Sequence, residues 1–145
     1  MARGAYTHLN LGEVEDAAVA NGFGHRWEAR VARTALGAEQ TGVSLFRIHP
    51  GRRSPFAHRH TTAEEVYVIL AGDGLIKLDD EVLTVRRLDA IRVAAGVVRA
   101  FEAGPDGLEL LAFGPHRSGD GEPVDDPWVN RAATGPFFRN RARVR

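Results

Sequence analysis

The chain contains no cysteine, so disulfide bonds, thiolate metal sites and cysteine nucleophiles are excluded. Any metal ion would therefore need imidazole and carboxylate ligands. Lysine is almost absent as well, because Lys77 is the only one and arginine supplies the other basic residues. The 19 basic residues balance the 19 acidic residues, so the chain has no net positive charge that would attract nucleic acid or an anionic membrane. We expect neither as a partner.

Long apolar runs are also missing, and no segment reaches the length that spans a membrane. The N-terminus lacks the basic-then-apolar pattern of a signal peptide, so we expect a cytoplasmic protein. Three short catalytic or binding motifs are absent too: the GxSxG elbow, the glycine-rich phosphate loop and HExxH.

Short apolar runs separated by turn residues make up most of the 145-residue chain. This pattern of short apolar runs is typical of an all-β sandwich or barrel, and the length of the chain suits a single domain. We expect a lead-in segment over 1–27 with a short helix near 13–20, a β-barrel domain over 28–114 and an irregular C-terminal extension over 115–145. Turn residues separate the runs at 71–74 and 104–107, among other places. The expected strands are 29–33, 42–48, 56–60, 65–70, 74–78, 81–85, 90–93, 98–102 and 108–113.

The stretch "HRHTTAEE" contains the strongest candidate site. Side chains two apart share one face of a β-strand, so His58 and His60 point the same way, together with Phe56. In the next strand Glu65 and Tyr67 share a face. If the two strands are neighbours and that face is internal, the two histidines and Glu65 converge. Two imidazoles and one carboxylate are the ligand set of non-haem iron sites.

This region resembles the cupin family. The first cupin motif is a glycine, a short spacer, HxH, three or four residues, a glutamate, six residues and a glycine. Gly51, His58, His60, Glu65 and Gly72 fit it, with a spacer one residue longer than usual. The resemblance spans roughly 42–113 and implies a small double-sheet β-barrel of the jelly-roll kind with the site inside it. It also assigns the ligand role to Glu65 and turns the neighbouring Glu64 outward.

The second cupin motif is only partly present, in "LDAIRVAAGVVRAFEA". Asp89 and Gly96 match the pattern, but Arg99 stands where the family has a histidine, which is the fourth metal ligand. An arginine cannot ligate a metal, because its guanidinium stays protonated. The resemblance therefore implies a barrel of the cupin kind whose fourth ligand has been replaced by a permanent cation.

Three interpretations of Arg99 remain open. In the first, His58, His60 and Glu65 hold iron, manganese, nickel or zinc, and Arg99 binds the carboxylate or enolate of a small anionic molecule beside the metal. The protein would then act as a metal-dependent oxygenase or isomerase, or bind such a molecule. In the second there is no metal, and a buried Glu65–Arg99 pair belongs to a small-molecule binding or sensor module. In the third Arg99 faces solvent and the site is vestigial.

In the metal-free interpretation Phe56, Tyr67, Ile69 and Phe101 would line the pocket, and in the metal-bound one Tyr67, Phe56 and Phe101 would bind the ligand together with Arg99. The strand at 65–70 is apolar on both faces, which requires cover on the outside. We expect a homodimer, the assembly that the resemblance favours. The C-terminal arginines at 139, 141, 143 and 145 predict either a solvated tail or a basic strap for an anionic partner.

Overall fold

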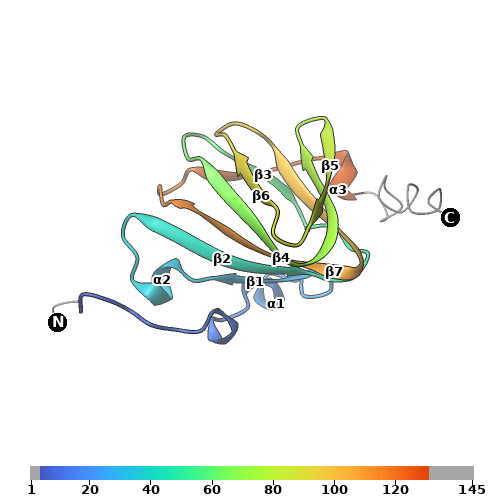
Figure 1. Ribbon diagram of the computed structural model, residues 1–145. Coiled ribbons are helices and arrows are strands. Elements are labelled where there is room, and N and C mark those ends of the chain that lie inside the picture. The colour runs from blue at the N-terminus through green and yellow to red at the C-terminus, as the bar shows by residue number, and fades with distance from the viewer. Residues whose placement is uncertain (1–3, 131–145) are drawn as a thin grey trace.

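Antiparallel strands curl into a double-sheet β-barrel in the computed structural model, which describes residues 4–130 (Figure 1). The all-β barrel predicted from the sequence is confirmed. One sheet path runs β1-β2-β7-β3-β8, and β4 pairs with β5, β6 and β7. The strands are β1 (Trp27–Val31), β2 (Thr41–Ile48), β3 (Ala57–His60), β4 (Glu65–Leu78), β5 (Glu81–Arg86), β6 (Ala90–Val93), β7 (Arg99–Pro115) and β8 (Gly121–Val124).

The two longest strands, β4 and β7, are each continuous where the sequence predicted turns at 71–74 and 104–107. Those turn predictions are wrong because the glycines in β4 allow the backbones of β4 and β7 to approach each other closely. A Cβ at Gly72 would lie 2.1 Å from the carbonyl oxygen of Gly107, and one at Gly74 would lie 2.1 Å from that of Glu102. The pairing register also jumps between these glycines, so residues 104–107 are accommodated as a bulge inside β7.

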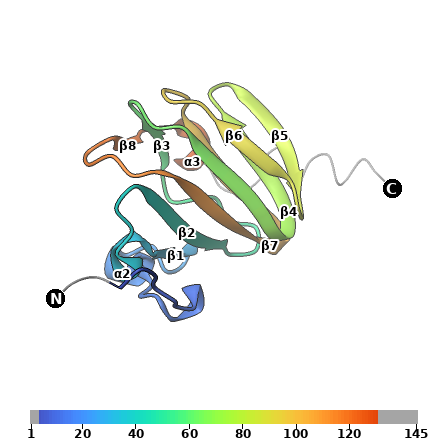
Figure 2. The same ribbon diagram turned by 60° about the vertical axis from the view of Figure 1, so that its left-hand side comes forward.

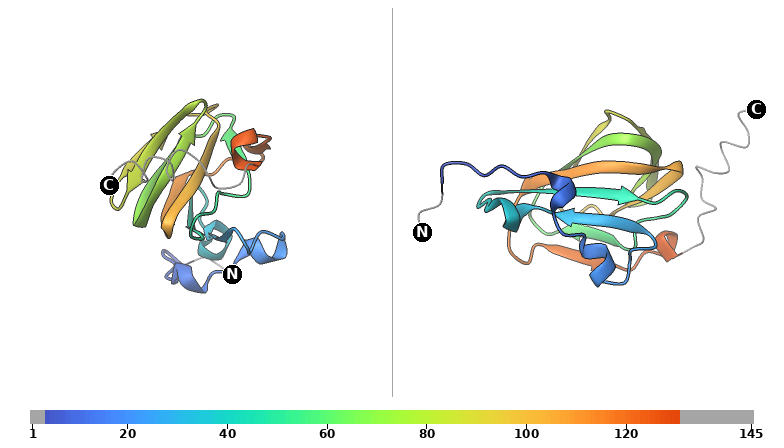
Figure 3. Two further views of the ribbon diagram at one scale, coloured as in Figure 1. Left: turned by 90° about the vertical axis from the view of Figure 1, so that its right-hand side faces the viewer. Right: turned by 90° about the horizontal axis from the view of Figure 1, so that it is seen from below.

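The N-terminal segment packs across the underside of the barrel against β1 (Figure 3). It contains the 3-10 helix η1 (Leu11–Glu13) and the short helix α1 (Ala17–Ala20). The Asp16 side chain caps α1 by accepting from the backbone N–H of Ala18, and it also accepts from the backbone N–H of Ala29 in β1, both at 2.9 Å. One carboxylate thus ties the helix to the strand. A second short helix, α2 (Arg33–Leu36), follows β1.

Residues 115–130, the described part of the extension predicted to be irregular, contain regular secondary structure. Strand β8 pairs antiparallel with β3, and the short helix α3 (Pro127–Asn130) follows it (Figure 2). Pro123 is tolerated because β8 lies at the end of the sheet path. Trp128 of α3 covers the guanidinium of Arg53, which lies 4.1 Å from the ring centroid. The predicted arginine-rich strap lies outside the described residues.

The barrel interior is filled by the strand face that the sequence predicted to point inward. Tyr67 and Ile69 are buried, whereas Val66 and Val68 on the opposite face are half-buried. The main core cluster consists of Ile48, Tyr67, Ile69, Ile76, Val85, Val93, Phe101, Ala103, Leu108, Leu110 and Ala112. Within residues 4–130 the helices are too short to cross a membrane.

Candidate functional site

His58, His60 and Glu65 converge at one end of the barrel, as the sequence predicted. The two histidines lie on β3, and Glu65 begins β4. Nε2 of His58 lies 3.5 Å from Oε1 of Glu65, and Nε2 of His60 lies 3.6 Å from Oε2. Each imidazole therefore faces one oxygen of the same carboxylate. Their side chains remain 30%, 21% and 19% exposed, so solutes can reach the group.

The possible ligand atoms of these three residues all lie within 4.8 Å of one another. They are the only such group of histidine, aspartate and glutamate side chains in the part of the chain that the structure describes. Glu64 points away from the site, where its carboxylate pairs with Arg92 at 3.1 Å, as the family resemblance implied. His49, a neighbour of the motif in sequence, lies 2.8 Å from the carbonyl oxygen of Gly24 and is remote from the cluster.

Asp120 organises the turn between β3 and β4. Its carboxylate accepts hydrogen bonds from the backbone N–H groups of Thr62 and Ala63, each at 2.9 Å, and from the hydroxyl of Thr62 at 2.6 Å. The hydrogen bond from the Thr62 side chain and these backbone donors lower the pKa of Asp120 to about 2. The carboxylate is therefore ionised throughout the neutral range. Its hydrogen bonds hold the turn that precedes Glu65 and so position this residue at the beginning of β4.

Asp120 also faces His60. Its Oδ2 lies 3.4 Å from Nδ1 of the imidazole, on the side away from Glu65. An acceptor at this place favours the tautomer with the proton on Nδ1, which leaves the lone pair on Nε2 directed at the cluster. Asp120 was not among the predicted site residues, because it lies in the segment predicted to be irregular and no local spacing connects it to the histidines.

Glu65 is held in its ionised form by its neighbours. Burial by itself would raise the pKa of this carboxyl, but hydrogen bonding from His58 and Tyr67, together with the charge that His58 and His60 can carry, holds the pKa below its usual value. The Tyr67 hydroxyl donates to Oε1 of Glu65 and lies 3.5 Å from Nε2 of His58. Burial and the adjacent Glu65 charge raise the pKa of Tyr67 well above its usual value, so it stays a neutral donor.

Arg99 begins β7 directly beside His58 in the sheet register and is completely buried. All three of its guanidinium nitrogens lack a hydrogen-bond partner among residues 4–130. The interpretation in which Arg99 faces solvent is therefore wrong. The Glu65–Arg99 pair of the metal-free interpretation is not formed either, because the Glu65 oxygens face the histidines and Tyr67.

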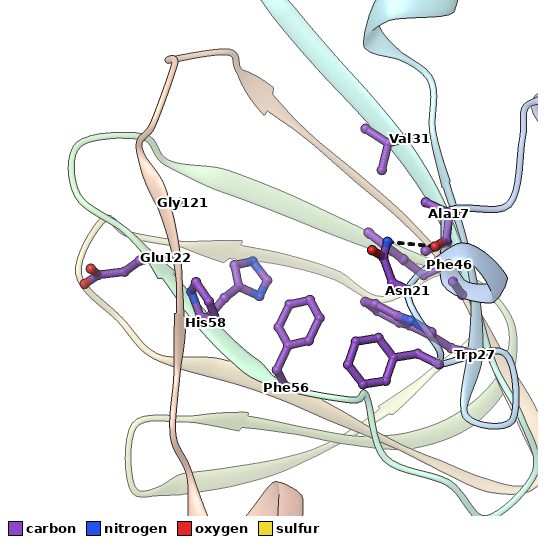
Figure 4. A pocket seen from close by; sticks show the side chains of 13 residues that line it. Ala17, Asn21, Trp27, Val31, Phe46, Phe56, His58, Gly121 and Glu122 are labelled. Atoms are coloured by element: carbon purple, nitrogen blue, oxygen red, sulfur yellow. Dashed lines mark hydrogen bonds between the residues drawn. The ribbon is translucent and has the colours of Figure 1, made fainter.

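A pocket of about 560 Å³ opens beside His58 (Figure 4). Its floor is aromatic: the rings of Trp27 and Phe46 stack at 4.6 Å, and Phe56 meets Trp27 edge-on at 5.8 Å. The remaining walls come from α1 and the turn that follows it, from β1 and from β8. The lining residues are Ala17, Ala18, Asn21, Phe23, Trp27, Ala29, Val31, Phe46, Phe56, His58, Gly121, Glu122 and Pro123.

A second cavity, of only about 20 Å³, lies deeper in the barrel and is lined by Arg99. It shares Trp27, Phe46, Phe56 and His58 with the larger pocket as common walls. Phe101 and Tyr67 line this inner cavity, where their rings meet edge-on at 5.0 Å, and do not line the outer pocket. Of the predicted pocket residues, Phe56 alone faces both spaces.

The donor set fits a divalent transition metal. Two imidazole nitrogens and an ionised carboxylate suit such an ion, and three protein ligands leave coordination positions for a substrate. The contact of Asp120 with His60 is the kind of outer support that orients ligating histidines. Among the described residues, Arg99 is an unfavourable neighbour for a metal: it lines the inner cavity together with His58, and its positive charge opposes a second cation unless an anion lies between them.

Residues 44–113 match the family model described as the cupin domain. Among solved structures, the chain is similar to the polyketide cyclase RemF from Streptomyces resistomycificus (TM-score 0.67, 19% identity, covering 92% of this chain and 96% of that one). It is also similar to a sugar phosphate isomerase of the cupin superfamily from Silicibacter pomeroyi (0.66, 20%, 83% of each chain). A cupin protein from Bacteroides fragilis matches as well (0.64, 21%, 86% and 92%). At these identities the likeness concerns the fold. No curated protein sequence matches significantly.

Proposed function

This chain is a small member of the cupin superfamily, and from that premise we propose that His58, His60 and Glu65 hold one divalent transition-metal ion beside a binding site for a small anionic molecule. The observation that supports this most strongly is the shared orientation of the two imidazoles, each with Nε2 toward one oxygen of Glu65. When bound, the metal would supply Lewis-acid or redox chemistry at a substrate oxygen.

Arg99 binds the anionic group of the ligand. Burying an unpaired guanidinium costs several kcal/mol, so the fold carries a cost that a bound carboxylate or enolate would offset. Such an anion could accept paired hydrogen bonds from the Arg99 fork. It would also lie between Arg99 and the metal ligands and would reduce the repulsion between the two positive charges.

The surrounding residues have supporting roles. Asp120 holds His60 in the tautomer whose Nε2 lone pair faces the cluster. The lowered pKa of Glu65 keeps its carboxylate ionised at neutral pH. The neutral Tyr67 hydroxyl orients Glu65 by donating to it. The aromatic walls formed by Phe56 and Phe101 keep bulk water away from the Arg99 charge. Oxygenation or isomerisation of a small anionic molecule is the reaction class that this arrangement suits.

We also propose that the chain forms a homodimer through the outer face of β4 and β7. Val66 and Val68 are half-buried there, and the neighbouring Phe113 is an exposed aromatic ring. Light scattering at micromolar concentration should give twice the monomer mass, and a monomer would contradict this proposal. The cytoplasmic location stays a prediction.

Elemental analysis by ICP-MS tests the metal site. Untagged protein is incubated with iron(II), manganese, nickel or zinc, dialysed and compared with the double variant His58→Ala/His60→Ala. His25→Ala, an exposed histidine outside the barrel strands, is the matched control. We expect near-stoichiometric metal in the parent and in His25→Ala, and loss in the double variant. Metal-free parent protein after every incubation would refute the metal site and leave a metal-free binding module as the alternative.

A further inference from the structure

The outer pocket beside His58 is unusually poor in polar groups for a site that binds an anion. Apart from His58 and the indole N–H of Trp27, its polar side chains are those of Asn21 and Glu122. The amide nitrogen of Asn21 donates to the carbonyl oxygen of Ala17 at 2.8 Å. Glu122 pairs with Arg59 and points away from the pocket (Figure 4). A ligand body placed here therefore meets mainly carbon.

A hydroxyl-rich molecule would fit this lining badly. Each sugar hydroxyl that leaves water for an apolar wall without a partner costs free energy, and the wall offers few partners. A flat ring, by contrast, gains contact with several aromatic side chains at once. Trp27, Phe46 and Phe56 supply these, and Phe23 meets Phe56 edge-on at 6.0 Å.

The polar end of the site lies inward. His58 forms part of the wall of both the outer pocket and the inner cavity, and the inner cavity is lined by Arg99, whose guanidinium nitrogens have no hydrogen-bond partner within residues 4–130. The inner cavity of about 20 Å³ has room for about one water molecule, so a ligand would lie in the outer pocket, with its apolar body against the aromatic rings and its anionic group directed past His58 toward Arg99. The volume of about 560 Å³ lies within the usual range for pockets that enclose a small organic ligand.

We propose that the ligand is an aromatic or conjugated-ring carboxylate or enolate, whose ring lies in the pocket formed by Trp27, Phe46 and Phe56 and whose single anionic group points to Arg99. The anionic end of this assignment rests on the proposed function, whereas the ring end rests only on the lining of the outer pocket. Trp27 is the specificity-determining residue, because it lines both spaces and stacks on Phe46.

Calorimetric titration of the metal-loaded full chain with four probes tests the ring assignment. The probes are 2-naphthoate, cyclohexanecarboxylate, acetate and ribose 5-phosphate. We expect 2-naphthoate to bind about tenfold more tightly than cyclohexanecarboxylate, because only the planar ring stacks. Acetate and ribose 5-phosphate should bind more weakly than either. Ribose 5-phosphate binding as tightly as 2-naphthoate, or no binding of any probe, would overturn the proposal.

Variants of the pocket make the same test independent of the metal. Trp27→Ala should weaken 2-naphthoate binding by about tenfold and leave acetate unchanged, with Trp27→Phe recovering part of the loss. Val31 lies at the pocket wall and is 54% exposed, so Val31→Glu should disturb folding little. The negative charge of the new glutamate should weaken the binding of 2-naphthoate. Tyr6→Ala removes an exposed aromatic ring outside the pocket and should change nothing.

The results separate the two proposals. Unchanged 2-naphthoate affinity in both Trp27→Ala and Val31→Glu would refute the ring pocket, whatever the metal content. Trp27-dependent binding of 2-naphthoate to protein that takes up no metal would uphold the ring pocket and refute the metal site. If every carboxylate bound the parent and Arg99→Met with the same affinity, Arg99 would not bind the anionic group. The ring preference would still be tested by comparing the parent with Trp27→Ala.

Discussion

Replacing Arg99 by methionine should stabilise the fold and abolish anion binding at the same time. The guanidinium is fully buried and its three nitrogens have no hydrogen-bond partner within residues 4–130, so the folded state bears a desolvation cost without compensation there. Exchanging buried charged groups for apolar ones of similar volume commonly gains about 1–4 kcal/mol. For a chain of this length each kcal/mol raises Tm by about 3 °C, so we expect a rise of roughly 3 to 12 °C.

The assay is thermal unfolding followed by circular dichroism and calorimetry, without added carboxylate. Arg99→Lys keeps the charge and should show no comparable gain, and Arg87→Met removes a charge at an exposed position and should leave Tm nearly unchanged. Metal titration of Arg99→Met should show tighter binding than in the parent, because the cation beside the ligands is gone. Binding of 2-naphthoate should fall in the same variant.

A fall in Tm for Arg99→Met would contradict the expected free-energy cost of burying this guanidinium. It would mean that the guanidinium makes a favourable interaction in the free protein, and that the cost of its burial is already offset without a ligand. Weaker metal binding in Arg99→Met would contradict the electrostatic part of the argument separately, because removal of a neighbouring positive charge can only favour a bound cation.

The remaining predictions concern residues around the site and its walls. Asp120→Asn should weaken metal binding by about 10–100-fold in a metal titration, because His60 loses the carboxylate that sets its tautomer. Asp16→Ala should cost about 1 kcal/mol in a denaturant titration through loss of the α1 cap. Burial alone would raise the pKa of Asp16, but its backbone hydrogen bonds lower it, so the cap's contribution is complete above the ordinary aspartate pKa and is lost as pH falls through the lowered value. Glu102→Gln should cost about 3–5 kcal/mol in the same titration, because it leaves the charge of buried Arg53 without its carboxylate at 2.9 Å.

Each of these outcomes has a matched control. Asp125→Asn changes an exposed aspartate close to α3 and should leave metal affinity unchanged, so equal affinity in Asp120→Asn would show that His60 needs no support. The stability difference between Asp16→Ala and the parent should disappear at pH values well below the aspartate range, and a constant difference would contradict the capping argument. Glu102→Gln should retain its metal, because the Arg53 pair lies outside the ligand group; loss of metal would mean that it supports the site.

Much of the candidate site could be predicted because it depends on local repetition. Side chains alternate faces along a strand, so "HRH" places two imidazoles on one face and "EVY" places Glu65 and Tyr67 on another, whatever the rest of the chain does. The inward face of β4 was predicted correctly for the same reason. The length of β4 was misjudged, because Gly72 and Gly74 look like turn residues in isolation, whereas in the fold they allow a close approach of two strands.

The amino-acid sequence was sufficient to predict the all-β class and to place the two histidines on one strand face and Glu65 with Tyr67 on another; the resemblance to cupins added the position of Arg99. Three features became visible only in the folded chain: Arg99 is buried without a hydrogen-bond partner among residues 4–130, Asp120 contacts His60 across 60 positions of chain, and α1 and β8 contribute walls to an aromatic pocket. The difference comes from the separation along the sequence of the residues that set each property. Alternation along a strand is set by neighbouring residues, whereas burial, pairing across the barrel and pocket walls depend on segments that meet only after the sheet has closed.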